Sequence, residues 1–176
     1  MKNNENSWKQ NGFTLVEMLV VIALVGVIAA AAIMGINPLA QIQKSNDAHR
    51  KSDLASLQRA LELYYQDNGS YPASSADFKL FINATTINWG GAWSPYMSIL
   101  PRDPLPSDTY VYYSPSTGNG QTYYIYATLQ RGTQDKQACN SGNACTTLTQ
   151  GVSGFPTATA CGGTCNYGVS SPNVSP

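Results

Sequence analysis

Few residues of this 176-residue chain could carry out acid, base or nucleophilic chemistry. His49 is the only histidine, and the sequence has no nucleophile elbow, no zinc-binding His pair and no phosphate-binding glycine loop. Asp103, Asp108 and Asp135 could in principle converge as a carboxylate-only hydrolase, but nothing in the sequence favours that arrangement. We therefore predict that the chain is not an enzyme and needs no cofactor.

The four cysteines are the second group of reactive side chains, because they can form disulfides or bind a metal. They lie in residues 132–176, a stretch rich in Gly, Ser, Thr and Asn, and allow three pairings. Their close spacing favours Cys139 with Cys145 and Cys161 with Cys165, which would staple a segment too polar to build its own core. A four-thiolate zinc site is the alternative, although intervals of five and three residues do not match its usual spacing. We predict disulfides, no metal, and a segment that decorates the surface.

A long apolar run near the amino terminus indicates where in the cell the chain is located. Residues 13–36 are apolar or glycine except for Thr14 and Glu17, and as a helix they would span about 36 Å, enough to cross a hydrocarbon core of about 30 Å. Lys2 and Lys9 before the run favour a cytoplasmic amino terminus. A cleaved secretory signal would be shorter, and a plain anchor leaves Glu17 unexplained, because a carboxylate in the membrane costs about 2.5 to 3.5 kcal/mol.

The six residues Gly12-Phe13-Thr14-Leu15-Val16-Glu17 follow a short basic leader and open this run. They resemble the class III signal of type IV pilins and pseudopilins. The resemblance implies that a prepilin peptidase removes residues 1–12 by cutting after Gly12, and that the new terminal Phe13 is methylated. It also implies that residues 13–36 remain as an assembly helix, in which Glu17 neutralises the amino terminus of an adjoining subunit.

The chain after the apolar run predicts a second helix. Asn37-Pro38 should kink or break the first one, because proline lacks a backbone donor and clashes with the preceding turn. Residues 37–67 then show an amphipathic pattern that would bury one face. That face consists of Leu54, Leu57, Leu61, Tyr64 and Tyr65.

Residues 68–131 predict a small head. We expect a short helix near residues 76–81 and two strands, 109–114 and 122–129, that form an antiparallel hairpin packed on the apolar face of the second helix. The predicted fold class is α+β. A long N-terminal helical spine, half of it transmembrane, packs on a small antiparallel sheet, as in pilins.

A second resemblance concerns a possible metal. Leu100-Pro101-Arg102-Asp103-Pro104 is similar to the Leu-Pro-Lys-Asp-Pro segment of the major pseudopilin of type II secretion. In those pseudopilins a downstream loop holds calcium, and Asp103 and Asp108 are the carboxylates available here. The Trp-Gly-Asn-Pro-Tyr sequence that usually follows is replaced by residues 105–110. Calcium ligation and ordinary turn-capping therefore both stay open for these two aspartates.

These observations favour a structural function. The 10 basic and 10 acidic residues leave no net charge for gathering phosphate, so a nucleic-acid partner is not expected. We predict a pilin that is inserted in the cytoplasmic membrane as a precursor and polymerises into a type IV pilus-like cell-surface filament. The alternatives are a type II secretion pseudopilin, a competence-type pilin, and a monomeric membrane-anchored adhesin or binding module. The implied partners are further copies of the chain, the prepilin peptidase, an inner-membrane assembly platform and an assembly ATPase.

Overall fold

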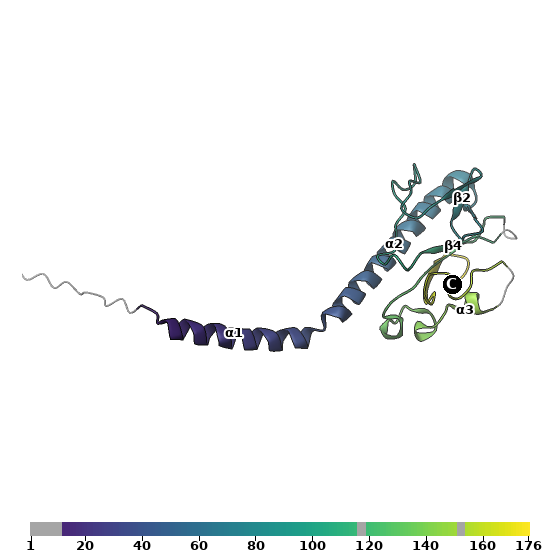
Figure 1. Cartoon of the computed structure of the whole chain (residues 1–176). Helices are drawn as coiled ribbons and strands as arrows, with labels where there is room; N and C mark the ends of the chain where they lie inside the picture. The colour runs from purple at the N-terminus through teal and green to yellow at the C-terminus, as the bar shows by residue number, and fades with distance from the viewer. Residues whose placement is uncertain (1–11, 116–118, 151–153) are drawn as a thin grey trace, which may run out of the picture. The chain divides into compact units, whose positions relative to one another are not determined.

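The computed structural model describes residues 12–115, 119–150 and 154–176, so the predicted leader lies outside the described residues except for Gly12. The chain divides into two compact units, Met1–Gln41 and Ile42–Pro176. Helix α1 belongs to the first unit, and the second contains all six strands that the structure describes (Figure 1).

Helix α1 runs from Leu15 to Ile36 and ends where the sequence predicts a break. Asn37 adopts the left-handed conformation, with φ 44° and ψ 74°, and α2 begins at the next residue, Pro38. Proline disfavours the helical conformation of the residue before it but suits the first turn of a new helix, where no backbone donor is needed. The break at Asn37-Pro38 is therefore confirmed.

Helix α2, Pro38–Asn68, supplies the buried face on which the head is built. Leu54, Leu57 and Leu61 have no exposed surface, as their spacing predicts. The helix stops at Gly69, whose φ of 70° requires the left-handed region and whose N–H donates to the carbonyl of Tyr65 at 2.8 Å.

Two three-stranded antiparallel sheets follow. The first contains β1 (Ala73–Ser74), β2 (Leu80–Ile82) and β3 (Thr85–Ile87) in that order. The short helix predicted at residues 76–81 is wrong: Phe78 turns the chain at φ 55°, and Leu80 then points inward while Phe81 is partly exposed. This alternation is the period of a strand.

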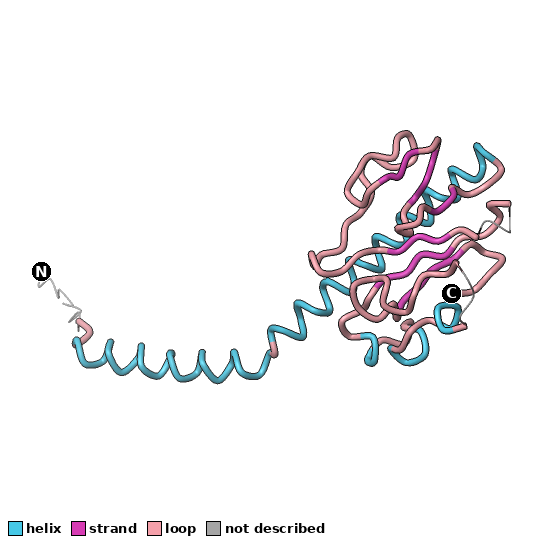
Figure 2. Tube along the Cα trace, turned by 45° about the vertical axis from the view of Figure 1, so that its right-hand side comes forward, coloured by secondary structure: helices cyan, strands magenta, loops and turns pink. Residues whose placement is uncertain are grey.

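The second sheet has the order β4 (Val111–Tyr113), β5 (Tyr124–Ala127), β6 (Tyr167–Ser170), and Figure 2 shows its strands side by side. The predicted hairpin is present, with Val111 opposite Tyr126. The third strand is not foreseen by the sequence. It comes from the C-terminal segment and pairs with β5, Ile125 lying opposite Val169.

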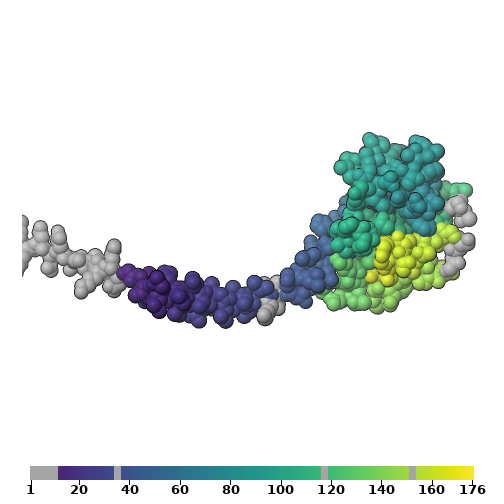
Figure 3. Space-filling view, in the orientation of Figure 1, coloured from purple at the N-terminus to yellow at the C-terminus, as the bar shows by residue number. Residues whose placement is uncertain are grey.

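Both faces of this second sheet are covered. One face contributes Tyr112, Ile125 and Ala127 to the cluster that contains the leucines of α2. The other face contributes Val111 and Tyr126 to a cluster with C-terminal residues, which include three of the cysteines. The C-terminal segment therefore does more than decorate the surface, although it also forms part of the outer face of the head (Figure 3). Its residues supply one strand and cover one face of the sheet.

The core between these layers is unusually rich in tyrosine, and each fully buried phenol has a partner. Buried hydroxyl groups need hydrogen bonds, because burial without one costs free energy. The pairs are Tyr110 with Asp53 at 2.6 Å, Tyr112 with the Pro72 carbonyl at 2.6 Å, Tyr123 with Glu62 at 3.2 Å, and Tyr126 with Thr147 at 2.6 Å.

Replacing Leu57 by Ala should lower the free energy of unfolding by about 2 to 5 kcal/mol, because it leaves a cavity between α2 and the sheet. Leu63→Ala on the same helix is the matched control, since Leu63 is 52% exposed, and it should change the free energy by less than about 0.5 kcal/mol. Urea unfolding followed by the fluorescence of Trp89 and Trp93 measures both. Equal effects would show that this face of α2 is not the core.

Candidate functional site

The start of α1 is closed by a pair of side chains. Thr14 is the N-cap, and its hydroxyl accepts from the Glu17 N–H at 3.2 Å. In return the Glu17 Oε2 accepts from the backbone N–H and from the hydroxyl of Thr14, both at 2.9 Å. This reciprocal arrangement is a capping box, which satisfies two backbone donors that the first turn leaves unpaired. The carboxylate of Glu17 thus has partners within its own helix.

Most of α1 is an apolar surface that is exposed in the described part of the chain. Its residues Leu15–Ile33 form the one candidate membrane span in the described part of the chain, and none of that span is buried. At about 1.5 Å per residue the 22 residues of α1 extend about 33 Å. Phe13, just before the cap, is also exposed. A surface of this kind requires lipid or other helices around it.

In the head, a buried arginine gathers three carboxylates. Arg50 lies on α2 and has no exposed surface. Its Nε and Nη2 donate to the two oxygens of Asp103 at 2.8 and 2.7 Å, and Nη2 also donates to Asp108 at 2.9 Å. Nη1 donates to Asp47, one turn earlier on the helix, at 3.1 Å. A planar guanidinium suits this forked geometry better than an ammonium group would.

Two of the carboxylates also accept hydrogen bonds from backbone N–H groups. Asp47 accepts from the N–H groups of Gln130 and Arg131 at 2.8 and 2.9 Å, and Asp103 accepts from the Leu105 N–H at 2.9 Å. Burial alone would lower the pKa of Arg50, but its hydrogen bonds to Asp103 and Asp47 and the charges of Asp103 and Asp108 raise the pKa above its ordinary value. Arg50 therefore stays protonated, and its bonds tie two loops to α2.

Next to it, Lys51 of α2 holds a third segment. Its ammonium group pairs with Asp135, donates to the Gln137 side chain at 2.8 Å and lies 5.5 Å from the ring centroid of Tyr167. Burial would raise the pKa of Asp135, but hydrogen bonds from Lys51 and from the Gln137 N–H and the charge of Lys51 lower it below its ordinary value. This pair fixes the chain just before the cysteines.

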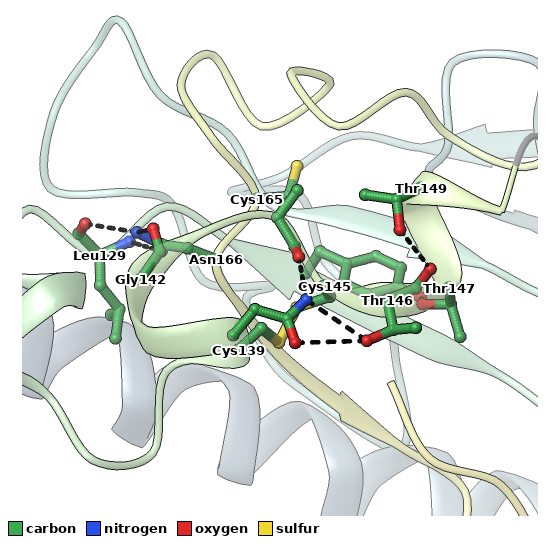
Figure 4. The surroundings of a disulfide bond; sticks show 12 residues. Leu129, Cys139, Gly142, Cys145, Thr146, Thr147, Thr149, Cys165 and Asn166 are labelled. Carbon is green, nitrogen blue, oxygen red and sulfur yellow. Dashed lines mark hydrogen bonds between the residues drawn. A yellow bond between two sulfur atoms is a disulfide. The ribbon is translucent and has the colours of Figure 1, made fainter.

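The four cysteines form two disulfides, Cys139–Cys145 and Cys161–Cys165, the pairing that their spacing favours. The two bridges belong to one network: the N–H of Cys145 donates to the carbonyl of Cys165 at 3.0 Å (Figure 4). Beside them the Asn166 side chain bonds Leu129 through both its oxygen and its nitrogen. The zinc alternative does not apply, because every cysteine is oxidised.

Comparison with known proteins shows the family to which the chain belongs. The model of the family "type II secretion system (T2SS), protein G" matches residues 37–144, and the prokaryotic N-terminal methylation motif matches residues 9–33. The chain belongs to the type II secretion system protein G family. The family match favours the predicted alternative, a type II secretion pseudopilin, over the type IV pilus subunit, and it agrees with a structural protein rather than an enzyme.

Individual relatives carry the same description, "type II secretion system core protein G". The one from Escherichia coli (strain K12) is 33% identical over 112 residues, 61% of this chain and 74% of the relative. The one from Pectobacterium carotovorum subsp. carotovorum is 32% identical over 107 residues, 59% and 67% of the two chains. The one from Pseudomonas aeruginosa is 28% identical over 136 residues, 74% and 92%. No solved structure is significantly similar to the chain.

The roles predicted for Gly12, Phe13 and Glu17 stay predictions, and the structure shows only where these residues lie. Gly12, Phe13 and Glu17 lie together at the exposed start of α1, and His49 is exposed on α2, as a solvated residue should be. Two features escaped the sequence analysis. The Thr14-x-x-Glu17 spacing is a capping-box signal that was available, whereas the burial of Arg50 in a polar stretch had little signal of its own.

Removing a disulfide should destabilise the head without unfolding it. Each bridge closes a short loop, so Cys139→Ala/Cys145→Ala or Cys161→Ala/Cys165→Ala should lower the free energy of unfolding by about 2 kcal/mol. Urea unfolding measures the change, and alkylation under non-reducing, denaturing conditions followed by intact mass checks that all four cysteines are oxidised. Thiols that alkylate in the unreduced protein would contradict it.

Stability should also depend on pH through Asp135. A carboxylate with a lowered pKa stabilises the fold above its unfolded pKa, near 3.9, and this contribution is lost as pH falls through the lower folded pKa. Asp135→Asn should therefore cost about 0.5 to 1 kcal/mol at pH 7 and little at pH 2.5. Asp67→Asn, at an exposed site, is the control. An equal cost for Asp135→Asn at both pH values would assign the effect to packing.

Proposed function

We propose that this chain is the major pseudopilin of a type II secretion system. It is inserted in the cytoplasmic membrane as a precursor, cut after Gly12 by a prepilin peptidase, methylated at Phe13, and polymerised through α1 into a short periplasmic pseudopilus. Assembly platform and ATPase act on it from the membrane and the cytoplasm. The observation that carries this proposal is the apolar span Leu15–Ile33, none of which is buried among the described residues and whose one carboxylate, Glu17, lies in the first turn.

The physics of α1 supports reversible transfer from membrane to filament. Lipid tails and the flanks of identical apolar helices are similar surroundings, so exchanging one for the other changes the hydrophobic free energy little. Ala23, Gly26 and Ala30 are small enough to let helices approach closely. Whether α1 prefers the filament to the membrane then depends on helix packing and on any polar group whose hydrogen bonds or ion pairs are stronger in the filament.

Glu17 is that polar group. In the single chain its carboxylate bonds Thr14, which reduces the cost of holding it in the apolar layer. Cleavage after Gly12 would create a positive amino group on Phe13, four residues before Glu17. In a filament, the carboxylate of one copy can pair with the amine of the next, and such a buried pair sets the axial register of the subunits more than it adds net stability.

The proposal predicts a trimmed amino terminus. Intact mass of the chain extracted from the membrane of its native source should lack residues 1–12 and carry one added methyl group. The same chain made in cells without a prepilin peptidase should keep the leader and form no filaments. A full-length mass in cells that contain the peptidase would contradict the proposal.

Variants at Glu17 separate a filament subunit from a monomeric anchored module. Glu17→Ala should reduce assembled filaments by about 100-fold or more, because an unpaired buried amine costs about 3 to 5 kcal/mol. Glu17→Gln keeps an oxygen for Thr14 but loses the charge, and it should fail equally. Val20→Ala, on the same exposed helix, is the control and should assemble.

Filament assembly is measured by ultracentrifugation and negative-stain imaging, with membrane insertion checked for every variant. If Glu17→Gln assembles normally, the capping box alone accounts for the residue. If Glu17→Ala also assembles normally, the chain acts as an anchor rather than a polymerising subunit.

A further inference from the structure

The resemblance at residues 100–104 leaves open whether Asp103 and Asp108 bind calcium, and the geometry of this chain permits a test of that fit. Calcium takes six to eight oxygen ligands at about 2.3 to 2.6 Å. Here both oxygens of Asp103 and one of Asp108 are already bonded to the guanidinium of Arg50. Among the described residues no group of three or more His, Cys, Asp or Glu side chains could hold a metal ion. The donor set does not fit.

Charge leads to the same result. A calcium ion close enough to bind Asp103 and Asp108 would stand beside a guanidinium that has no exposed surface. The calcium ion and the guanidinium would repel each other strongly, because water screens charges only weakly at a buried site. The oxygens can serve either Arg50 or a metal.

We propose that Arg50 is the resident cation of this loop, that it holds the loop as a calcium ion would, and that the head therefore folds and keeps its stability without a divalent metal. This proposal does not depend on the proposed function, because it concerns the fold of the head alone.

The contacts show what the resident cation does. The fork to Asp103 and the bond to Asp108 join both ends of the loop 103–108 to α2. Asp108 also accepts from the hydroxyl of Ser107 at 2.9 Å. Through Asp47 the same guanidinium reaches the backbone N–H groups of residues 130 and 131. One side chain thus anchors two loops, as a multidentate metal ion would.

The surplus of negative charge is compensated by the backbone. Three carboxylates face one guanidinium, and the N–H groups of Leu105, Gln130 and Arg131 donate to two of them. Hydrogen bonds from N–H groups stabilise the charged form of a carboxylate. Because Arg50 belongs to the chain, the loop cannot lose its cation to a chelator or in a calcium-poor compartment.

The first test uses the full chain, purified in detergent and desalted into chelator-treated buffer. Elemental analysis should find far less than one calcium per chain. The thermal midpoint of the head, followed by the fluorescence of the buried Trp89 and Trp93, should be the same in excess EDTA and in millimolar calcium. A ligand that binds only the folded state raises the midpoint. One retained calcium per chain, or a midpoint that rises with calcium and falls with EDTA, would overturn the proposal.

The second test changes the cation itself. Arg50→Gln should lower the midpoint by about 5 to 15 °C, because it leaves buried carboxylates without their partner. Arg50→Lys, which keeps the charge but not the fork, should fall between this variant and the natural chain. Arg59→Gln removes an exposed arginine of the same helix and should change little.

A double variant keeps the test decisive if Arg50→Gln does not fold. In Arg50→Gln/Asp103→Asn a neutral amide replaces each partner of the forked pair, so this chain should fold and be more stable than Arg50→Gln alone. An Arg50→Gln midpoint equal to that of the natural chain, or a double variant less stable than Arg50→Gln, would overturn the assignment of Arg50 as the cation that holds the loop.

Discussion

The head of this protein depends on one face of α2. Arg50, Leu54, Leu57 and Leu61 follow one another at intervals of four, three and four residues, so they form a single stripe along the helix, and all four are fully buried. The apolar part of the stripe packs against the second sheet. Its charged end binds the loops instead. One helix face therefore supplies both the hydrophobic contact that holds the sheet and the ionic contact that fixes the chain around it.

Much of this could be read from the sequence, because the signals were local. A 3.6-residue period marks the leucine stripe, Asn37-Pro38 marks the break between helices, and β-branched and aromatic residues around a Gly-rich turn mark the hairpin β4–β5. The start of α1 is similar: Gly12, Phe13 and Glu17 stand in a short motif with a defined spacing. In these cases neighbouring residues decide the structure.

The features that the sequence did not predict depend on residues far apart along the chain. Strand β6 pairs with a strand more than forty residues earlier, and it is too short and too polar to be recognised alone. Arg50 lies among Lys, Asp and Ser, where a solvated side chain is the ordinary expectation, and its partner Asp103 is 53 residues away. The register with Leu54 was the one local signal that Arg50 faces inward. A charged residue in phase with a buried stripe is worth testing for a buried partner.

The two helices have opposite relations to the rest of the chain. The α2 stripe is buried within the head, whereas none of the span Leu15–Ile33 of α1 is buried by the residues that the structure describes. An exposed apolar helix of this length is stabilised by surroundings such as lipid or other apolar helices. Because lipid and helix flanks are nearly equivalent for its apolar side chains, small polar terms decide between them. Under the proposed function, a single carboxylate with two alternative partners, Thr14 of its own helix and the amine of a neighbouring copy, would then be the polar group that controls assembly.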